Sequence, residues 1–294
     1  MKVPFPGTFF LSDIIKKQKR REGKSMKMRK VFALMMTLVM VFAFAACGSS
    51  TSDNGSADSE SLTLTDGTLK VAMEIGYPPM EYFDKDGTTP IGFDVEISKA
   101  IAEYLGLEVE YVDVAWDGIF SGLDSDKYDI VCSSCSITPE RQKNFLMTKP
   151  YVQNRIELLV PKGSDITGLD TVEGKSIAVQ AETTCDIYLK DHDTGCDVMQ
   201  YDKIINCFDE LKANRVDGVL VDSVVASYYL GEDEDKYDVV WEGEDAEPLG
   251  ITLKKGNDEL CEKIEEALDA LAADGTTKEI AMKYFGNDIT EGLR

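Results

Sequence analysis

Two charged residues stand at the ends of predicted elements, where side chains can reach a bound molecule. Arg141 follows Thr138-Pro139-Glu140, a helix start with Thr as cap and Pro in the first turn. Its guanidinium is always charged and offers paired donors that match a carboxylate. Asp222 ends an apolar run at 218–221, where an acid either binds a cation or caps the next helix. Taken alone, Arg141 is more simply an exposed residue at a helix start.

The cysteines allow several states but predict no metal site. Besides Cys47, the chain carries Cys132, Cys135, Cys185, Cys196, Cys207 and Cys261. Outside the cytoplasm six cysteines permit disulfides, in 15 possible pairings, although buried reduced thiols are the favoured interpretation. Cys132 and Cys135 form a CxxC motif, but no second one accompanies it and His192 is the only histidine. A structural zinc site is therefore not expected, and no cofactor is predicted.

Charge is distributed unevenly along the 294 residues. The first 46 residues hold 10 of the 31 Lys and Arg, and the rest of the chain carries 52 of the 54 Asp and Glu. So acidic a body repels phosphate backbones, which argues against a nucleic-acid partner. A well-solvated surface is the simplest interpretation of this charge.

Short apolar and amphipathic segments alternate through the body. Strands are predicted at 69–73, 107–114, 128–132, 155–160, 176–180, 218–222 and 251–254. Helices are predicted at 95–106 with Asp94 as N-cap, and at 116–123, 184–190, 205–214, 223–230 and 259–273. Alternating units of this length indicate an α/β protein with parallel sheets covered by helices. The coarse organisation is two α/β halves.

The N-terminal segment predicts export. Lys27, Arg29 and Lys30 precede a largely apolar run at 31–46 that ends in small residues, as in a secretory signal. Residues 1–25 look like a mis-called start, because Met26 and Met28 are plausible alternatives. N-terminal sequencing of the precursor tests this hypothesis.

The residues after the apolar run indicate how the exported protein is held. Ala45-Ala46-Cys47 resembles a bacterial lipobox, in which Cys47 receives a diacylglycerol, although Phe44 departs from the usual aliphatic residue. Cleavage after Ala45 or Ala46 without lipidation is the alternative. Residues 47–66 are rich in Ser, Gly, Asp and Thr and predict a disordered tether.

Four short blocks follow one another along the body: GYPPME at 76–81, GFDVEI at 92–97, SITPER at 136–141 and VDS at 221–223. In this order they resemble family 3 of the bacterial solute-binding proteins, the polar-amino-acid receptors of ABC importers. The resemblance runs from about Thr68 to Gly286 and includes the closing LAADGT at 271–276 and YFG at 284–286.

This resemblance implies a two-lobed periplasmic-binding-protein-like fold of type II, each lobe a mixed sheet flanked by helices, with two hinge strands. We expect residues 67–153 plus 254–294 in the first lobe and 154–253 in the second. The hinges are expected near 154–160 and 249–253. The ligand is expected in the cleft between the lobes, where closure traps it.

The resemblance also implies ligand-binding roles for eight residues. Arg141 matches the carboxylate-binding Arg, Asp222 matches the acid that pairs with the α-ammonium, and Glu74 matches an acid found in receptors of cationic amino acids. Tyr77 and Trp116 match aromatic residues that sandwich the ligand side chain. The set is Glu74, Tyr77, Trp116, Ser134, Ser136, Arg141, Thr184 and Asp222. Glu182 stands where the family usually has Gly.

We therefore expect an extracytoplasmic, lipid-anchored, monomeric receptor that binds a free amino acid and delivers it to ABC importer permease subunits. A cationic ligand (arginine, lysine, ornithine or histidine) is favoured, and a polar neutral amino acid or cystine is the alternative. A dehydratase-type enzyme on the same fold is a second hypothesis, in which Glu74 or Glu182 acts as general acid through a raised pKa. A sensor ectodomain is a third, and the lack of a spanning segment after Arg294 counts against it.

Overall fold

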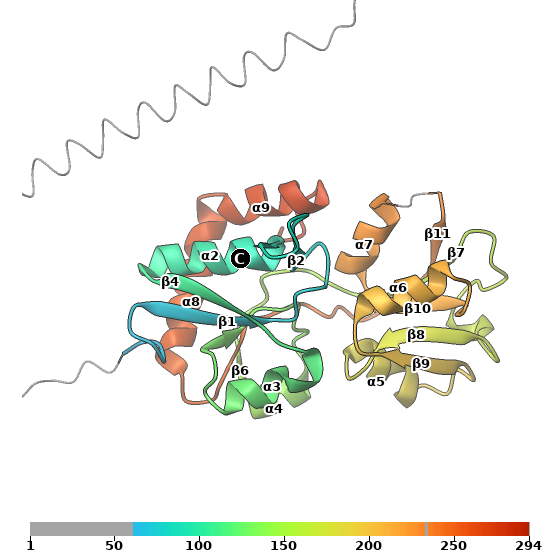
Figure 1. Ribbon diagram of the computed structural model, residues 1–294, viewed down its shortest axis with the longest axis horizontal. Helices are drawn as coiled ribbons and strands as arrows, with labels where there is room; N and C mark the ends of the chain where they lie inside the picture. Colours follow the sequence, from blue (N-terminus) through green and yellow to red (C-terminus); the bar gives the residue numbers. More distant parts are fainter. Residues whose placement is uncertain (1–60, 233–234, 294) are drawn as a thin grey trace, which may run out of the picture. The chain divides into compact units, whose positions relative to one another are not determined.

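The computed structural model describes residues 61–232 and 235–293, which belong to one compact unit with two lobes (Figure 1). The predicted signal segment, the lipidation site at Cys47 and most of the predicted tether lie outside the described residues. Residues 61–66, the end of that tether, lie against the first lobe. Thr63 is buried and the Leu64 amide donates to the Asp129 carboxylate at 2.7 Å. These six residues therefore belong to the folded part.

The first lobe is built on a mixed five-stranded sheet in the order β4-β1-β5-β12-β6. Its strands are β1 (Thr68–Met73), β4 (Glu108–Asp113), β5 (Ile130–Val131), β6 (Leu146–Met147) and β12 (Thr252–Leu253). β1 is parallel to β4 and β5, whereas β12 is antiparallel to β5 and β6. A short hairpin, β2 (Tyr82–Phe83) with β3 (Pro90–Ile91), follows β1.

Alternate residues of β1 face two different cores. Val71 and Met73 pack with the helices α2 (Phe93–Leu105), α8 (Asp258–Ala273) and α9 (Thr276–Phe285). Ala72 packs on the other face, with side chains of α3 (Trp116–Asp124). The strand period of two thus buries both faces of the sheet, which explains the apolar run of Val71, Ala72 and Met73 at the end of β1.

The second lobe has its own mixed sheet in the order β11-β7-β10-β8-β9. Its strands are β7 (Ile156–Pro161), β8 (Ser176–Gln180), β9 (Asp197–Tyr201), β10 (Gly218–Asp222) and β11 (Tyr237–Glu242). β8 is parallel to β9 and β10, and β7 is antiparallel to β10 and β11. Its helices are α5 (Thr184–Asp191), α6 (Ile204–Lys212) and α7 (Ser223–Glu232), with a 3₁₀ turn at Leu169–Thr171. Both sheets therefore contain the parallel strands expected from the alternating pattern together with antiparallel ones, and the mixed lobes implied by the family resemblance are confirmed.

The chain crosses between the two sheets twice. It leaves β6 and enters β7 through residues 148–155, and it returns from β11 to β12 through residues 243–251. The crossing segments pair antiparallel: the Leu249 amide donates to the Val152 carbonyl at 3.0 Å, and the Glu247 amide to that of Asn154 at 2.9 Å. The ranges expected for the hinges overlap these crossings only in part, because β7 already begins at Ile156.

Asp94 does not cap α2. The helix begins at Phe93 with Gly92 as N-cap, and Asp94 lies inside the first turn. Its side chain instead accepts hydrogen bonds from the Ser134 amide at 2.8 Å and the Tyr151 hydroxyl at 2.7 Å. Asp94 therefore ties α2 to the loop after β5, which carries predicted site residues.

Gly92 is required where the turn at 76–81 meets α2. Its φ is 137°, and a Cβ there would lie 2.1 Å from the Met80 carbonyl oxygen. In the same turn, the Pro79 carbonyl accepts a hydrogen bond from the Phe93 amide, and the Met80 carbonyl accepts one from the Asp94 amide. The GYPPME and GFDVEI blocks thus form one unit that places Tyr77.

We expect Gly92→Ala to lower the free energy of unfolding by at least about 2 kcal/mol, because the clash involves rigid backbone. Chemical unfolding of the purified protein measures this. Gly118→Ala is the matched control, because a Cβ at Gly118 would meet no atom within 4 Å and Ala favours the α3 helix. Equal stability of the two variants contradicts the prediction.

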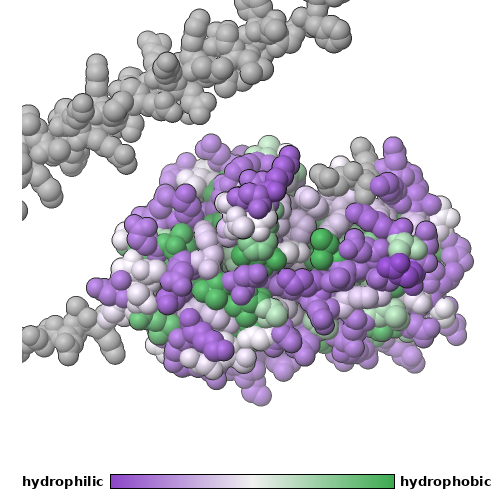
Figure 2. Space-filling model, viewed as in Figure 1, coloured by the Kyte–Doolittle hydropathy of each residue, from purple (hydrophilic) through white to green (hydrophobic). Residues whose placement is uncertain are grey.

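Within the described residues no helix is long and apolar enough to cross a membrane. The visible face of the body is mostly hydrophilic, with small apolar patches (Figure 2), as expected from its acidic composition.

Candidate functional site

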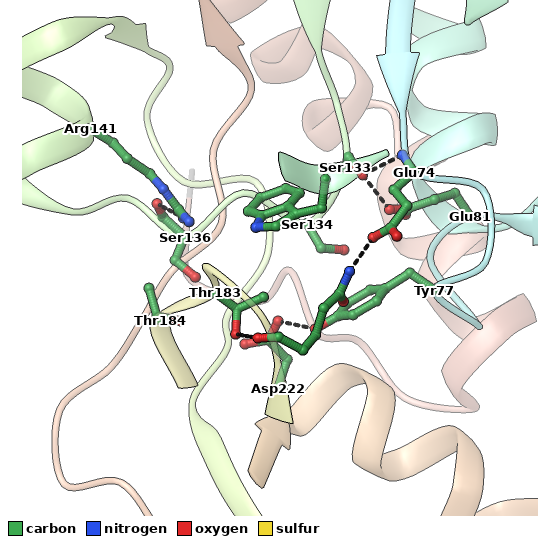
Figure 3. Close-up of a pocket in the computed structure, with 12 residues that line it drawn as sticks. Glu74, Tyr77, Glu81, Ser133, Ser134, Ser136, Arg141, Thr183, Thr184 and Asp222 are labelled. Carbon is green, nitrogen blue, oxygen red and sulfur yellow. Dashed lines mark hydrogen bonds between the residues drawn. The ribbon is translucent and has the colours of Figure 1, made fainter. Parts of the chain in front are cut away.

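A cavity lies between the lobes, and residues from both lobes line it (Figure 3). All eight predicted site residues line this cavity. The first lobe contributes Glu74, Tyr77, Glu81, Trp116, Ser133, Ser134, Ser136 and Arg141, and the second contributes Gln180, Thr183, Thr184 and Asp222. Their common location is a structural result, and their roles toward a ligand stay predictions.

Arg141 lies in the first turn of α4 (Pro139–Asn144), as the Thr-Pro-Glu-Arg pattern predicts. Thr138 caps this helix by accepting the Arg141 amide at 3.1 Å. The guanidinium donates from Nη1 to the Ser136 carbonyl at 2.9 Å and lies 5.3 Å from the Trp116 and Phe120 ring centroids. One carbonyl and two rings thus orient a fork whose other donors are available for an anion.

Asp222 ends β10 and is 6% exposed. Its Oδ2 accepts from the Tyr77 hydroxyl at 2.6 Å, and its Oδ1 accepts from Asn154 Nδ2 at 2.6 Å. Burial raises the pKa of the Asp222 carboxyl to about 6, although both hydrogen bonds lower it. The carboxylate is thus held rigidly in a place where a cation is the natural partner.

Glu74 follows β1 directly and is 4% exposed. Its amide donates to Ser133 Oγ at 3.0 Å, and its Oε2 accepts from Gln180 Nε2 at 2.5 Å. Its Oε1 is buried without a hydrogen-bond partner. Burial raises the pKa of the Glu74 carboxyl to about 6, while Gln180 and Lys203 lower it. An unpaired buried carboxylate oxygen is costly, and a donor supplied by a ligand removes that cost.

Glu81 forms a second buried carboxyl beside Glu74. It is 1% exposed, and its Oε1 accepts from Ser133 Oγ at 2.6 Å. Burial, together with the nearby charge of Asp94, raises the pKa of Glu81 well above its ordinary value. Burial of Glu81 thus disfavours its ionised form.

A second hydrogen bond between the lobes links Trp116 of the first lobe to the loop at Glu182 of the second. Trp116 is 9% exposed and donates from Nε1 to the Glu182 carbonyl at 3.2 Å. Glu182 has φ of 63°, a left-handed conformation that explains why glycine is usual in the family at this place. Its side chain does not line the cavity.

Ser134 and Thr184 present polar groups from loop and helix-start positions. Ser134 has φ of 48° and a buried Oγ without a partner. Thr184 is the first residue of α5, where backbone amides have no partner within the helix, and Thr183 is its N-cap. A carboxylate is well matched to such amides.

Four lining residues were not predicted: Glu81, Ser133, Gln180 and Thr183. Glu81 lies inside the GYPPME block, and Ser133 inside the Cys-Ser-Ser-Cys run. Gln180 is the polar last residue of a predicted strand and follows the apolar run Ile177-Ala178-Val179. Such a residue at the carboxyl end of a parallel strand is a signal for a site, because ligands bind at that edge.

The cysteines of the described part are free thiols, of which Cys132, Cys135, Cys185 and Cys207 are buried. Burial raises the pKa of each of these four thiols. No group of three His, Cys, Asp or Glu residues able to hold a metal is found among the described residues.

Comparison with known proteins is consistent with this geometry. The profile of the bacterial extracellular solute-binding proteins, family 3, matches residues 69–287. The L-cystine-binding protein TcyJ of Escherichia coli K12 is 33% identical over 76% of this chain and 85% of its own length. ABC transporter arginine-binding protein 1 of the same strain is 32% identical over 71% of this chain and 87% of its own.

Solved structures give the same fold. An ancestral arginine-binding protein bound to arginine matches 75% of this chain and 99% of its own, with a TM-score of 0.71 and 38% identity. The ancestral amino acid-binding protein AncCDT-1, described as a precursor of cyclohexadienyl dehydratase, matches 74% of this chain and 96% of its own, with a TM-score of 0.70 and 33% identity.

Proposed function

The chain belongs to family 3 of the bacterial extracellular solute-binding proteins, and we propose that it binds one free amino acid between its lobes and delivers it to an ABC importer. The observation that carries this proposal is that one cavity is lined by both a guanidinium and a buried carboxylate. Arg141 comes from the first lobe and Asp222 from the second. An amino acid carries the complementary pair, a carboxylate and an ammonium.

The partners of the ligand's α-carboxylate and α-ammonium are assigned by matching opposite charges. Arg141 and the amides at the start of α5 around Thr184 receive the α-carboxylate, with Ser134 and Ser136 as further donors. Asp222 receives the α-ammonium, because its oxygens are already oriented by Tyr77 and Asn154. Both charges then regain partners for the water they lose on burial.

Glu74 determines which ligand side chain is favoured in this proposal. In Figure 3, Arg141 and Glu74 lie on opposite sides of the cavity, with Ser134 between them. The unpaired Oε1 of Glu74 favours a side chain that ends in a positive group, as in arginine, lysine or ornithine. Tyr77 and Trp116 supply aromatic surface for the aliphatic stem. L-cystine is the alternative, since its second ammonium also suits Glu74.

The remaining parts of the proposal concern location and partners. We infer export by the segment before Cys47, a lipid anchor on Cys47 at the outer face of the cell membrane, and a monomeric receptor that the permease recognises when closed. Metabolic labelling with a radioactive fatty acid tests the anchor, and a Cys47→Ser variant that still carries label contradicts it.

A thermal-shift screen against the 20 amino acids, ornithine and cystine tests the proposal. A ligand that binds only the folded protein raises Tm by an amount that grows with the logarithm of its concentration divided by its Kd. We expect cationic amino acids to give the largest shifts, and Glu74→Gln to weaken their binding about 10- to 100-fold. The same variant should affect neutral amino acids little. A neutral amino acid that outranks every cation and cystine contradicts the role of Glu74, and no shift with any amino acid contradicts the receptor proposal itself.

The raised pKa of Glu74 also favours a second candidate, a dehydratase-type reaction with Glu74 as general acid. A dehydratase assay with a cyclohexadienyl acid separates the two proposals. Turnover that Glu74→Gln abolishes supports the enzyme, whereas binding without turnover supports the receptor.

A further inference from the structure

Gln180 of the second lobe forms a hydrogen bond with Glu74 of the first. Gln180 Nε2 donates to Glu74 Oε2 at 2.5 Å and to the Asp202 carbonyl at 3.1 Å. Gln180 is 3% exposed and Glu74 is 4% exposed, so water does not compete for this contact. The amide group is thus fixed at both of its hydrogens, one facing each lobe.

The two carboxylate oxygens of Glu74 therefore differ in their hydrogen bonding. Gln180 occupies Oε2, whereas Oε1 is buried without a hydrogen-bond partner, and the residue as a whole lines the cavity. The backbone of Glu74 is held separately, by Ser133 Oγ. A bound side chain therefore meets a carboxylate whose position is set by both lobes and whose available acceptor is Oε1.

We propose that Gln180 is a specificity-determining positioning residue, which holds one oxygen of Glu74 so that the other selects a positively charged ligand side chain. This inference rests on the proposed function. It adds that recognition of the ligand side chain depends on closure, because the Gln180–Glu74 contact forms only when the two lobes meet. Gln180 acts through Glu74, and Glu74 contacts the ligand.

Several charged groups act on Glu74 besides its ligand. Asp113 and Asp117 of the first lobe raise its pKa, and Lys203, next to Asp202 in the second lobe, lowers it. Glu81 also lines the cavity, and burial raises the pKa of its carboxyl. Because Gln180 also lowers the pKa of Glu74, removal of its amide moves protonation of Glu74 to higher pH. Cation affinity falls as pH drops through the pKa of Glu74, so this fall should begin at a higher pH without Gln180.

The test compares the purified wild-type protein with Gln180→Met, a near-isosteric variant without hydrogen-bond donors. Titration with L-lysine, L-arginine, L-ornithine and L-glutamine at pH 5 to 8 gives the affinity of each. We expect affinity for the cations to fall about 10- to 100-fold at pH 7, glutamine to change little, and the pH midpoint for the cations to rise. Gln180→Leu is the second variant if the first does not fold.

Gln200→Leu is the matched control, because Gln200 lies on the neighbouring strand β9 and donates to the Asp186 carboxylate at 2.8 Å, outside the cavity. It should leave affinity and pH midpoint unchanged. In Glu74→Gln, the added Gln180→Met change should have little further effect on cation affinity. An unchanged pH midpoint, or equal losses for lysine and glutamine, overturns the inference while leaving the receptor function in place. Failure of the wild-type protein to bind any amino acid overturns the proposed function instead.

Discussion

Replacement of Arg141 by alanine is expected to abolish amino-acid binding at ordinary ligand concentrations, with a loss of roughly 30- to 5,000-fold in affinity. Removal of one partner of a desolvated, hydrogen-bonded charge pair costs about 2–5 kcal/mol, because the other charge is left buried. In this cavity the ligand carboxylate would lose its guanidinium, which the Ser136 carbonyl and the Trp116 and Phe120 rings hold in place.

Calorimetric titration of the variant with the best wild-type ligand measures this loss. Arg141→Lys should recover only part of the affinity, because an ammonium lacks the planar fork. Arg215→Ala is the control, since Arg215 pairs with Glu210 at the surface, away from the cavity. Binding that survives Arg141→Ala within about threefold contradicts the assignment of the carboxylate site.

Replacement of Asp222 by asparagine is expected to have the second largest effect, a loss of about 2–5 kcal/mol in binding. The ligand ammonium loses its countercharge, and the amide nitrogen of Asn cannot accept the hydrogen bond from Tyr77 or Asn154. Because Tyr77 belongs to the first lobe and Asp222 to the second, the variant also weakens a contact between the lobes.

The control for this change is Asp129→Asn, another buried carboxylate, which accepts the Leu64 and Lys70 amides of the first lobe at 2.7 Å. Both variants should lower Tm, but only Asp222→Asn should lose amino-acid binding. If Asp222→Asn binds as tightly as wild type, Asp222 does not receive the ammonium.

The elements that could be predicted from the sequence are those with a strong local pattern. β8 and β10 match their predicted ranges because each contains three consecutive apolar residues and ends in a polar one. β9 and β11 were missed, since both are edge strands whose side chains are largely exposed, with polar residues interleaved. Strand direction could not be read locally, because the antiparallel pairs of β7 and β12 arise where the chain crosses between the lobes.

The site residues also differ in whether a local sequence pattern predicts them. Arg141 and Thr138 could be placed from the residues alone, because the Thr-Pro-Glu-Arg pattern is a complete helix start. Tyr77, Trp116 and Ser134 needed the family resemblance, since an aromatic or a serine in a loop has no local signature. Gln180 and Glu81 acquire their importance only through contacts with Glu74 and Ser133, which are 106 and 52 residues away in sequence.

Binding of one free amino acid between the lobes is the assignment on which the roles of all these residues depend. Isothermal titration calorimetry of the purified protein with L-lysine, L-arginine and L-ornithine measures it directly. We expect one-to-one binding by at least one of these ligands, lost in Arg141→Ala and weakened below about pH 6, where Glu74 and Asp222 take up protons. Absence of heat with all three, and with cystine and the remaining amino acids, would contradict the assignment.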